Sequence, residues 1–338
     1  MIIQSNMLYS LDDIMIEPAP VTDIRHRNEV QTTYDDGYLP IFTSPMPCVV
    51  STEASQYKKY IEGHINPILP RTELIETRLD FDHYGDMFIA FSLNEFEKYF
   101  VEDDVNASDY AEPIKVLIDI ACGNMKHLHD VIKAAKAKHG DNLIIMSGNV
   151  ASPRGFEELA DSGCDYIRCS VGTGSGCNTA TYTGVYYPMA SLLESCYRLK
   201  KSFYKKVKII ADGGITNFRN AYKALALGAD YVMMGSRLCQ CSDSAGSIDI
   251  NEETGDKCKV YYGMASKIGS QMLGKDTVAP EGMIKKYPIL EPISEFSTLF
   301  SKYLASTMSY CNCRNLEEFI GNQKLVIISP SAAKKFNQ

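Results

Sequence analysis

The sequence has no excess of positive charge, which argues against a nucleic-acid surface. It carries 34 lysine and arginine residues against 42 aspartate and glutamate residues, a net charge of −8 at pH 7. A protein that neutralises many phosphates usually has a basic excess or a concentrated basic stripe, and neither is evident here. A small anionic ligand is still compatible with this charge, because backbone N–H groups at turns and helix N-termini can bind phosphate.

The sequence also lacks any apolar run near the ~18 residues of a membrane-spanning helix. Its first residues, MIIQSNMLYSLDD, have no basic region, apolar stretch and cleavage site of a secretory signal. Eleven cysteines without such a signal are expected to be reduced thiols rather than a disulfide framework. The C-x-C pairs Cys239/Cys241 and Cys311/Cys313 lack the spacing and paired histidines of structural zinc sites. We expect a soluble, cytoplasmic protein that does not contact membranes.

What the sequence does contain is a regular series of short apolar runs. Hydrophobic residues make up 45% of the chain, enough to bury a large core. The runs are rich in β-branched residues and are bounded by Gly, Pro, Asn, Asp or Ser, as buried parallel strands are. Eight of them are found, at residues 40–44, 66–69, 87–92, 115–120, 142–147, 166–170, 208–211 and 231–235.

Segments with helical spacing lie between these runs, for example at 127–138, 155–162, 189–200 and 217–227, the last followed by Gly228 as a helix stop. This alternation predicts parallel pairing with right-handed crossovers. Eight repeats without a break in strand order favour a (β/α)8 TIM barrel, formed as one domain by residues 1–338. An open, doubly wound sheet is the alternative.

The residues that could take part in catalysis or ligand binding fall at the C-terminal ends of the predicted strands, where barrel enzymes have their active sites. They are Ser44-Pro45-Met46, Asp119, Gly148-Asn149, residues 172–177, Asp212-Gly213-Gly214 and Gly235-Ser236. Residues 238–271 are polar with repeated Ser, Asp and Gly, and this composition predicts a long flap loop over the barrel mouth.

The loop after the sixth strand combines three glycines with the thiol of Cys177. Gly172, Gly174 and Gly176 permit left-handed backbone and close approach of a ligand. Cys177 is therefore a candidate nucleophile at the barrel mouth. The alternative is a small buried hydrophobic residue, which is the more common role of a cysteine in a chain that has eleven.

Four further sites each leave two interpretations open. The turns Asp212–Gly214 and Gly235-Ser236 follow strands seven and eight, where barrels often bind phosphate, although both could be simple tight turns. Asp119 could accept a hydrogen bond from a ribose or a cofactor amide, or be a turn or helix N-cap residue. Glu281 could act in the site or be a solvated loop carboxylate.

Taken in order, these motifs resemble the IMP dehydrogenase/GMP reductase family over about residues 11–314. Each motif is short, and it is their number and order at the predicted strand ends that carry the resemblance. The matching segments are LDDI at 11–14, SPM at 44–46, ID at 118–119, GNV at 148–150, GTGSGCNT at 172–179, ADGGI at 211–215, LGADYVMMGS at 227–236, YGM at 262–264 and PEG at 280–282.

The resemblance implies roles at matched positions. Cys177 would attack C2 of a purine nucleotide, with Thr179 and Glu281 supplying protons, and Asp119 would face the nicotinamide of NADPH. The nucleotide would be held by Ser44, Met46, Asn149, Ser175, Asp212, Gly214, Gly235, Ser236, Gly263 and Met264. Carbonyl oxygens of Gly172, Gly174 and Cys177 could bind a monovalent cation such as potassium. The family also implies a homotetramer.

Within the family, the reductase branch fits better. No regulatory domain of the CBS type is inserted between Ser92 and the strand at 115–120, and residues 264–281 contain no Arg-Tyr pair, which dehydrogenases use to activate water. Thr183-Gly184-Val185 followed by Tyr187-Pro188 resembles the reductase pattern. We therefore expect NADPH-dependent deamination of GMP to IMP. The alternatives are an IMP dehydrogenase that uses NAD, and a non-catalytic barrel that binds purine nucleotides.

Overall fold

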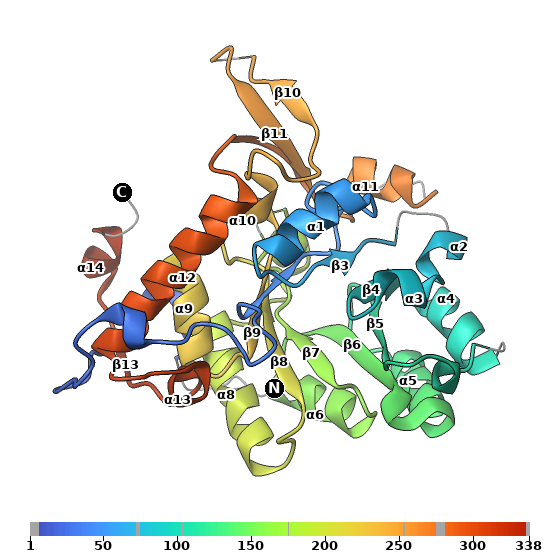
Figure 1. Cartoon of the computed structure of the whole chain (residues 1–338), viewed down its shortest axis with the longest axis horizontal. Coiled ribbons are helices and arrows are strands. Elements are labelled where there is room, and N and C mark those ends of the chain that lie inside the picture. The colour runs from blue at the N-terminus through green and yellow to red at the C-terminus, as the bar shows by residue number, and fades with distance from the viewer. Residues whose placement is uncertain are drawn as a thin grey trace.

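The structure, a computed structural model, describes residues 7–71, 75–102, 105–174, 176–252, 254–274 and 281–335. Within this part of the chain, eight strands form one parallel sheet in the order β2-β9-β8-β7-β6-β5-β4-β3 (Figure 1). The strands are β2 (Ile41–Thr43), β3 (Ile68–Leu69), β4 (Phe88–Phe91), β5 (Ile114–Ile118), β6 (Leu143–Val150), β7 (Tyr166–Cys169), β8 (Lys208–Asp212) and β9 (Tyr231–Met234).

The two edges of this sheet meet at Asn66. A parallel bridge joins Phe42 of β2 to Asn66, which lies just before β3. The Asn66 amide donates to the carbonyl of Ile41 at 3.1 Å, and the Thr43 amide donates to the carbonyl of Asn66 at 3.0 Å. The predicted (β/α)8 barrel is therefore confirmed, and the open doubly wound sheet is excluded.

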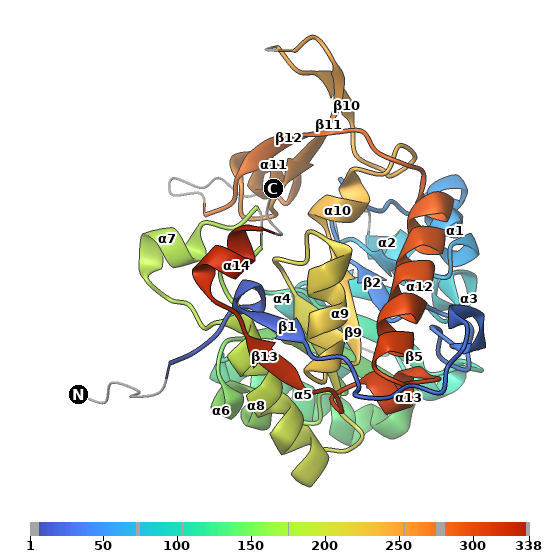
Figure 2. The ribbon, with the colours of Figure 1, turned by 90° about the vertical axis from the view of Figure 1, so that its left-hand side faces the viewer.

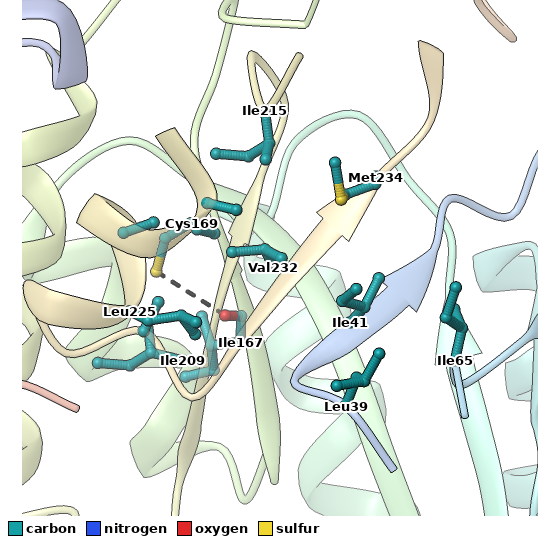
Figure 3. Packing of buried hydrophobic residues seen from close by; sticks show 14 of the residues in the cluster. Leu39, Ile41, Ile65, Ile167, Cys169, Ile209, Ile215, Leu225, Val232 and Met234 are labelled. Atoms are coloured by element: carbon teal, nitrogen blue, oxygen red, sulfur yellow. Dashed lines mark hydrogen bonds between the residues drawn. The ribbon is translucent and has the colours of Figure 1, made fainter. Parts of the chain in front are cut away.

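Successive side chains of each strand point alternately into the barrel and out toward the helices, and both environments are apolar. One set of side chains, including Phe42, Phe88 and Met233, fills the inside of the barrel as a separate buried cluster. Their sequence neighbours, such as Ile41 and Val232, point outward into a larger cluster beneath the helices (Figure 3). Both faces of each strand are buried, so the runs show no polar alternation.

The longer helices surround the barrel, and each of the four predicted segments matches one of them to within a few residues. Two of these helices begin at a side-chain cap: the Ser152 side chain accepts the Gly155 amide before α6, and the Asn217 side chain accepts the Asn220 amide before α9. These helices are α1 (Ala54–Glu62), α5 (Lys126–His139), α6 (Pro153–Asp161), α8 (Met189–Ser202), α9 (Phe218–Ala226) and α12 (Ile293–Tyr310). None of the described helices is long and apolar enough to cross a membrane.

Shorter helices occupy the connections and the end of the chain. They are α2 (Ile75–Arg78), α3 (Phe81–Tyr84), α4 (Leu93–Glu97), α7 (Thr179–Thr183), α10 (Ser236–Cys239), α11 (Lys267–Met272), α13 (Leu316–Phe319) and α14 (Pro330–Lys334). Strand β1 (Ile14–Ile16) pairs antiparallel with β13 (Leu325–Ile327), so segments near the two ends of the chain lie together beside α9 (Figure 2).

The predicted flap loop is not confirmed, because residues 238–271 contain regular structure. Strands β10 (Ile248–Ile250) and β11 (Lys257–Tyr262) pair antiparallel, and β12 (Ile284–Pro288) pairs with the other edge of β11. Figures 1 and 2 show this small sheet projecting from the barrel. The polar composition of this segment is not typical of strands. Strand β12 also lies outside the segment, and local sequence carries little information about such pairing.

Candidate active site

The loop after β7 is folded tightly enough to present Cys177. Gly172 has φ +77, and a Cβ atom there would lie 2.8 Å from the Cβ of Ala180, so the start of the loop packs on α7. The Cys177 amide donates to the Gly174 carbonyl at 2.9 Å. The glycines thus bring the backbone back on itself and set the thiol at the C-terminal end of the barrel.

Accessibility distinguishes Cys177 from most of the other cysteines. All eleven lie within the described residues and all are free; nine are buried, Cys122 is exposed and Cys177 is half-buried. Burial raises the pKa of Cys241 to about 12 and that of Cys311 to about 11, so these thiols stay protonated. Within the described residues no group of three or more His, Cys, Asp or Glu side chains could hold a metal ion.

Cys177 begins a chain of three hydrogen-bonded side chains. Its Sγ lies 3.1 Å from Oγ1 of Thr179, and that hydroxyl donates to Oε2 of Glu281 at 2.6 Å. All three side chains are partly buried. The arrangement gives a proton on the sulfur a direct path to a carboxylate, which is what activation of a thiol nucleophile requires. Glu281 is therefore a partly buried carboxylate, hydrogen-bonded to Thr179 beside the thiol.

The backbone around Glu281 is paired with the cysteine loop. Cys177 and Gly282 form an antiparallel bridge. The Asn178 amide also donates to the carbonyl of Glu281 at 2.7 Å. The carboxylate is consequently fixed relative to the thiol by main-chain as well as side-chain contacts.

The other side of this segment is paired with the residues that follow β11. The Gly282 amide donates to the carbonyl of Ala265 at 3.1 Å, and the Gly263 amide donates to the carbonyl of Met283 at 3.1 Å. A Cβ atom at Gly282 would lie 2.3 Å from the backbone nitrogen of Ser266, a distance that no side chain could tolerate. Glycine is needed here because two backbones approach so closely.

A buried arginine gathers the polar residues at the ends of four neighbouring strands. Arg168 of β7 is 6% exposed. Its guanidinium contacts Asp119 at 3.1 Å, Asn149 at 3.1 Å and Asp212 at 3.2 Å. The Asn149 amide donates to Asp212 at 2.7 Å, and Arg71 pairs with Asp119 at 3.1 Å. Two carboxylates are thereby neutralised and held in fixed orientations.

The structure excludes one interpretation of Asp119, that of a cap for α5. Helix α5 begins seven residues later, at Lys126, with Met125 as its N-cap residue, so Asp119 does not cap it. Arg168 and Arg71 were not predicted from the sequence. The sequence did offer one signal for Arg168: it is a charged residue within the otherwise uncharged run YIRC, and a charge in a buried strand needs a partner.

The turn after β8 lies against the cysteine loop. Gly213 and Gly214 have φ values of +92 and +73, which favour glycine. A Cβ atom at Gly213 would lie 2.8 Å from Oγ1 of Thr173, and one at Gly214 would lie 3.0 Å from the Thr173 carbonyl oxygen. The predicted ribose and phosphate residues Asp212 and Gly214 therefore stand beside the loop that carries the thiol.

The turn after β9 lies close to Ser44 and to Tyr261. A Cβ atom at Gly235 would be 3.0 Å from the Ser44 hydroxyl oxygen and 3.0 Å from the Tyr261 hydroxyl oxygen. Ser44 and Ser236 are buried side chains with polar hydroxyl groups. Ser175, also predicted to hold the phosphate, lies outside the described residues.

Tyr261 is a third residue that sequence reasoning missed. Its hydroxyl donates to the sulfur of Met46 at 3.7 Å, and its ring would lie 2.9 Å from a Cβ atom at Gly176. It therefore touches the Met46 loop, the cysteine loop and, at Gly235, the turn after β9. It was missed because residues 238–271 were interpreted as an irregular loop, in which Tyr261 has no defined position.

Gly263 and Met264 complete the set of predicted positions. A Cβ atom at Gly263 would lie 2.8 Å from the carbonyl oxygen of Gly176, so this glycine packs directly on the cysteine loop. Met264 follows it and packs partly buried against the main core. The predicted residues within the described chain thus occupy one connected region at the C-terminal ends of the strands.

Comparison with known proteins shows the family. The family model described as IMP dehydrogenase / GMP reductase domain matches residues 102–337. The chain belongs to this family. Members of the family are oxidoreductases that act on purine nucleotides with nicotinamide cofactors.

Individual relatives carry both names. The chain is 32% identical over 233 residues to an inosine-5′-monophosphate dehydrogenase of Chlorobaculum parvum, which covers 65% of this chain and 46% of the relative. It is 33% identical over 206 residues to human GMP reductase 1, which covers 60% of this chain and 58% of the relative. The chain therefore spans about half the length of the curated relatives it matches, and these identities do not separate the two reactions.

Proposed function

We propose that the protein is a GMP reductase, which converts GMP to IMP and ammonia with NADPH through a covalent thioimidate on Cys177. The observation that carries this proposal is the hydrogen-bonded chain from Cys177 through Thr179 to Glu281. Residues 264–281 contain neither arginine nor tyrosine, so the pair that dehydrogenases of the family use to activate water has no counterpart there.

The first step requires two proton movements that this chain of side chains can supply. The sulfur of Cys177 attacks C2 of GMP, and the thiol proton passes through the Thr179 hydroxyl to Glu281. The C2 amino group then takes up a proton from the same carboxyl and leaves as ammonia, because an unprotonated amide ion is a very poor leaving group. A thioimidate between the sulfur and C2 remains.

The carboxylate at Asp119 fits the nicotinamide side of the site. It stands at the end of β5, is fixed by two arginines and does not cap α5, so it can orient a polar group of a cofactor. When bound there, NADPH supplies a hydride to C2. Glu281, which has given its proton to the departing ammonia, takes up a new proton from solvent; Cys177 then departs as a thiolate and receives that proton through Thr179, which completes the cycle.

The nucleotide would lie across the connected region described above. Backbone N–H groups of Gly214 and Gly235 and the hydroxyls of Ser44 and Ser236 would hold the 5′-phosphate, and Asp212 the ribose hydroxyls. The base would lie beside Met46, Asn149, Gly263 and Met264. Preorganisation of these groups by glycine-rich turns would hold the bound nucleotide in a productive orientation.

A monovalent cation such as potassium would bind the carbonyl oxygens of Gly172, Gly174 and Cys177. The Gly174 carbonyl already accepts the Cys177 amide at 2.9 Å, and its second lone pair can still face a cation. Such an ion would stiffen the loop rather than take part in bond making. The further proposals of a homotetramer and of a cytoplasmic location follow from the family resemblance and from the sequence.

The covalent step has a direct test that does not depend on the direction of the redox reaction. Wild-type protein incubated with GMP alone and quenched with acid should show, by intact mass, a gain of GMP minus ammonia. Cys177→Ala should show no gain. If wild type forms no adduct from GMP alone and none from IMP with NAD, while purine nucleotide binds normally, the non-catalytic nucleotide-binding barrel is the better description.

An IMP dehydrogenase remains the second candidate, favoured by the relatives of that name that match 65% of the chain. It would form a related adduct from IMP only in the presence of NAD. Its discriminating experiment compares the two cofactor and nucleotide pairs.

A further inference from the structure

The guanidinium of Arg237 lies against two neighbouring aromatic rings next to the turn after β9. Arg237 follows Ser236 directly in α10. Its Cζ is 5.0 Å from the ring centroid of Phe296 and 5.7 Å from that of Phe218, and the two rings are 5.2 Å apart. These are the separations of cation–π contacts, so the side chain is held by stacking as well as by charge.

The same guanidinium forms an ion pair with Glu291. The side chains are 13% and 15% exposed, so the pair is largely removed from water. Backbone hydrogen bonds attach this segment to the end of α10: the Leu290 amide donates to the Gln240 carbonyl at 2.8 Å, and the Ser242 amide donates to the Glu291 carbonyl at 3.2 Å. Arg237 therefore fastens α10 to the connection between β12 and α12.

These contacts link three parts of the site. Phe218 begins α9, just beyond the Asp212–Gly214 turn. Glu291 lies on the chain that continues from Glu281 through β12. Arg237 itself continues from the Gly235-Ser236 turn. One side chain thus joins the two turns of the nucleotide region to the segment of the catalytic carboxylate, without facing the thiol relay.

We propose that Arg237 is a positioning residue that sets nucleotide affinity by fixing the Gly235-Ser236 turn; this rests on the proposed binding of phosphate at that turn. Helix α10 has only four residues and little stability of its own, so its orientation depends on tertiary contacts. N–H and O–H donors bind an anion well when they are oriented before it arrives. The Cys177 relay is made by other segments, so turnover of bound substrate is not expected to need Arg237.

Stability alone does not account for an arginine here. Nη1 of Arg237 is buried and has no hydrogen-bond partner within the described part of the chain. A buried donor without a partner is costly, and apolar residues of similar volume often replace a buried ion pair at no loss of stability. The charged side chain is better explained by the fixed orientation that its stacking and ion pair impose on α10.

Arg78 provides a matched control elsewhere in the barrel. It is 2% exposed, pairs with Glu95 at 2.7 Å and lies with its Cζ 5.2 Å from the ring centroid of Phe91. Like Arg237, it combines a carboxylate partner with a cation–π contact, and its Nη1 also donates to the Ala90 carbonyl at 2.8 Å. It stands beside β4 and away from the Gly235-Ser236 turn, so Arg78→Met removes a buried ion pair and a cation–π contact without touching that turn.

The experiment measures the Kd of GMP and of IMP by calorimetry, together with KM, kcat and Tm for each variant. We expect Arg237→Met to raise Kd and KM by about tenfold while kcat changes by less than about threefold. Arg78→Met should lower Tm and leave both Kd values unchanged. Arg237→Lys, which keeps the charge but not the planar fork, should fall between wild type and Arg237→Met.

Wild-type Kd values in Arg237→Met, with only Tm lowered as in Arg78→Met, would overturn the inference and leave Arg237 a structural residue. If Arg237→Met does not fold, Glu291→Gln is compared with Glu95→Gln in the same way. If wild type oxidises IMP with NAD, the proposed reductase is refuted, but the comparison of Kd values still tests whether Arg237 sets nucleotide affinity. A wild type that binds neither nucleotide removes both proposals.

Discussion

The hydroxyl of Thr179 donates a 2.6 Å hydrogen bond to Glu281 across 102 positions of the sequence. The contact exists because the backbone of Gly282 passes close to Ser266 on one side and pairs with Cys177 on the other. The Glu281 carboxylate, which would transfer protons, is therefore held against the loop that carries Cys177.

Glu281→Gln should lower kcat by about 100-fold, because an amide can neither accept the thiol proton nor return it. The Kd of GMP should change little, since the side chain stays in place. Thr179→Val should have a similar effect, and the double variant should be no slower than the worse single one, because the two residues act in one chain. Steady-state kinetics with Glu317→Gln as an exposed control checks this; additive losses would contradict the relay.

Arg168→Met should destabilise the fold by about 3 kcal/mol, because it leaves Asp119 and Asp212 without their shared counter-charge in a buried position. Urea unfolding gives the value. Arg198→Met breaks an exposed ion pair with Glu194 and should cost less than about 0.5 kcal/mol. Equal losses in the two variants would show that the Arg168 network adds no stability beyond that of a surface pair.

Iodoacetamide should modify Cys177 and Cys122 in the folded protein and spare the nine buried cysteines. The reason is access, because burial excludes the reagent and disfavours thiolates such as those of Cys241 and Cys311. Saturating GMP should protect Cys177 and leave the rate at Cys122 unchanged. Peptide mass spectrometry follows each site; protection of both sites, or of neither, is the result that would count against nucleotide binding beside Cys177.

Stability should rise with pH between about 8 and 10.5 through Lys223. Burial lowers the pKa of this side chain from 10.5 to about 8, with the charge of Arg219 acting in the same direction. Between those values the unfolded chain holds the proton and the folded protein does not, so raising the pH favours the folded state; below about 8 both states are protonated and the effect is constant.

The check is urea unfolding of wild type and Lys223→Met at about pH 7.5 and about pH 9.5. The difference in unfolding free energy between the two proteins should shift in favour of wild type at the higher pH. Lys223 also donates to the Leu11 carbonyl at 2.8 Å, and Lys223→Met loses this hydrogen bond at both pH values. A difference that does not change with pH would refute the lowered pKa.

The barrel could be predicted because its signal is local. Each strand is apolar on both faces, as Ile41 and Phe42 illustrate by pointing into different clusters. Strand β11 could not be predicted in the same way. Its partner β12 lies beyond the polar segment, and Tyr261, which touches three parts of the site, was hidden with it.

The candidate site could be predicted where motifs mark it and not where ion pairs complete it. The resemblance pointed to Cys177, Thr179 and Glu281, which the structure brings together. Arg168 and Arg71 carry no motif. Their pairing with Asp119 depends on which strands are neighbours and in what register, and a single sequence gives this only after the barrel has been built.

The central claim is that the Cys177–Thr179–Glu281 chain serves reductive deamination. The most direct measurement is nicotinamide absorbance in two mixtures of the pure protein, GMP with NADPH and IMP with NAD, with ammonia assayed in both. The account predicts NADPH oxidation in the first mixture with one ammonia released for each NADPH consumed, and no NAD reduction in the second. Turnover in the IMP and NAD mixture alone would contradict it.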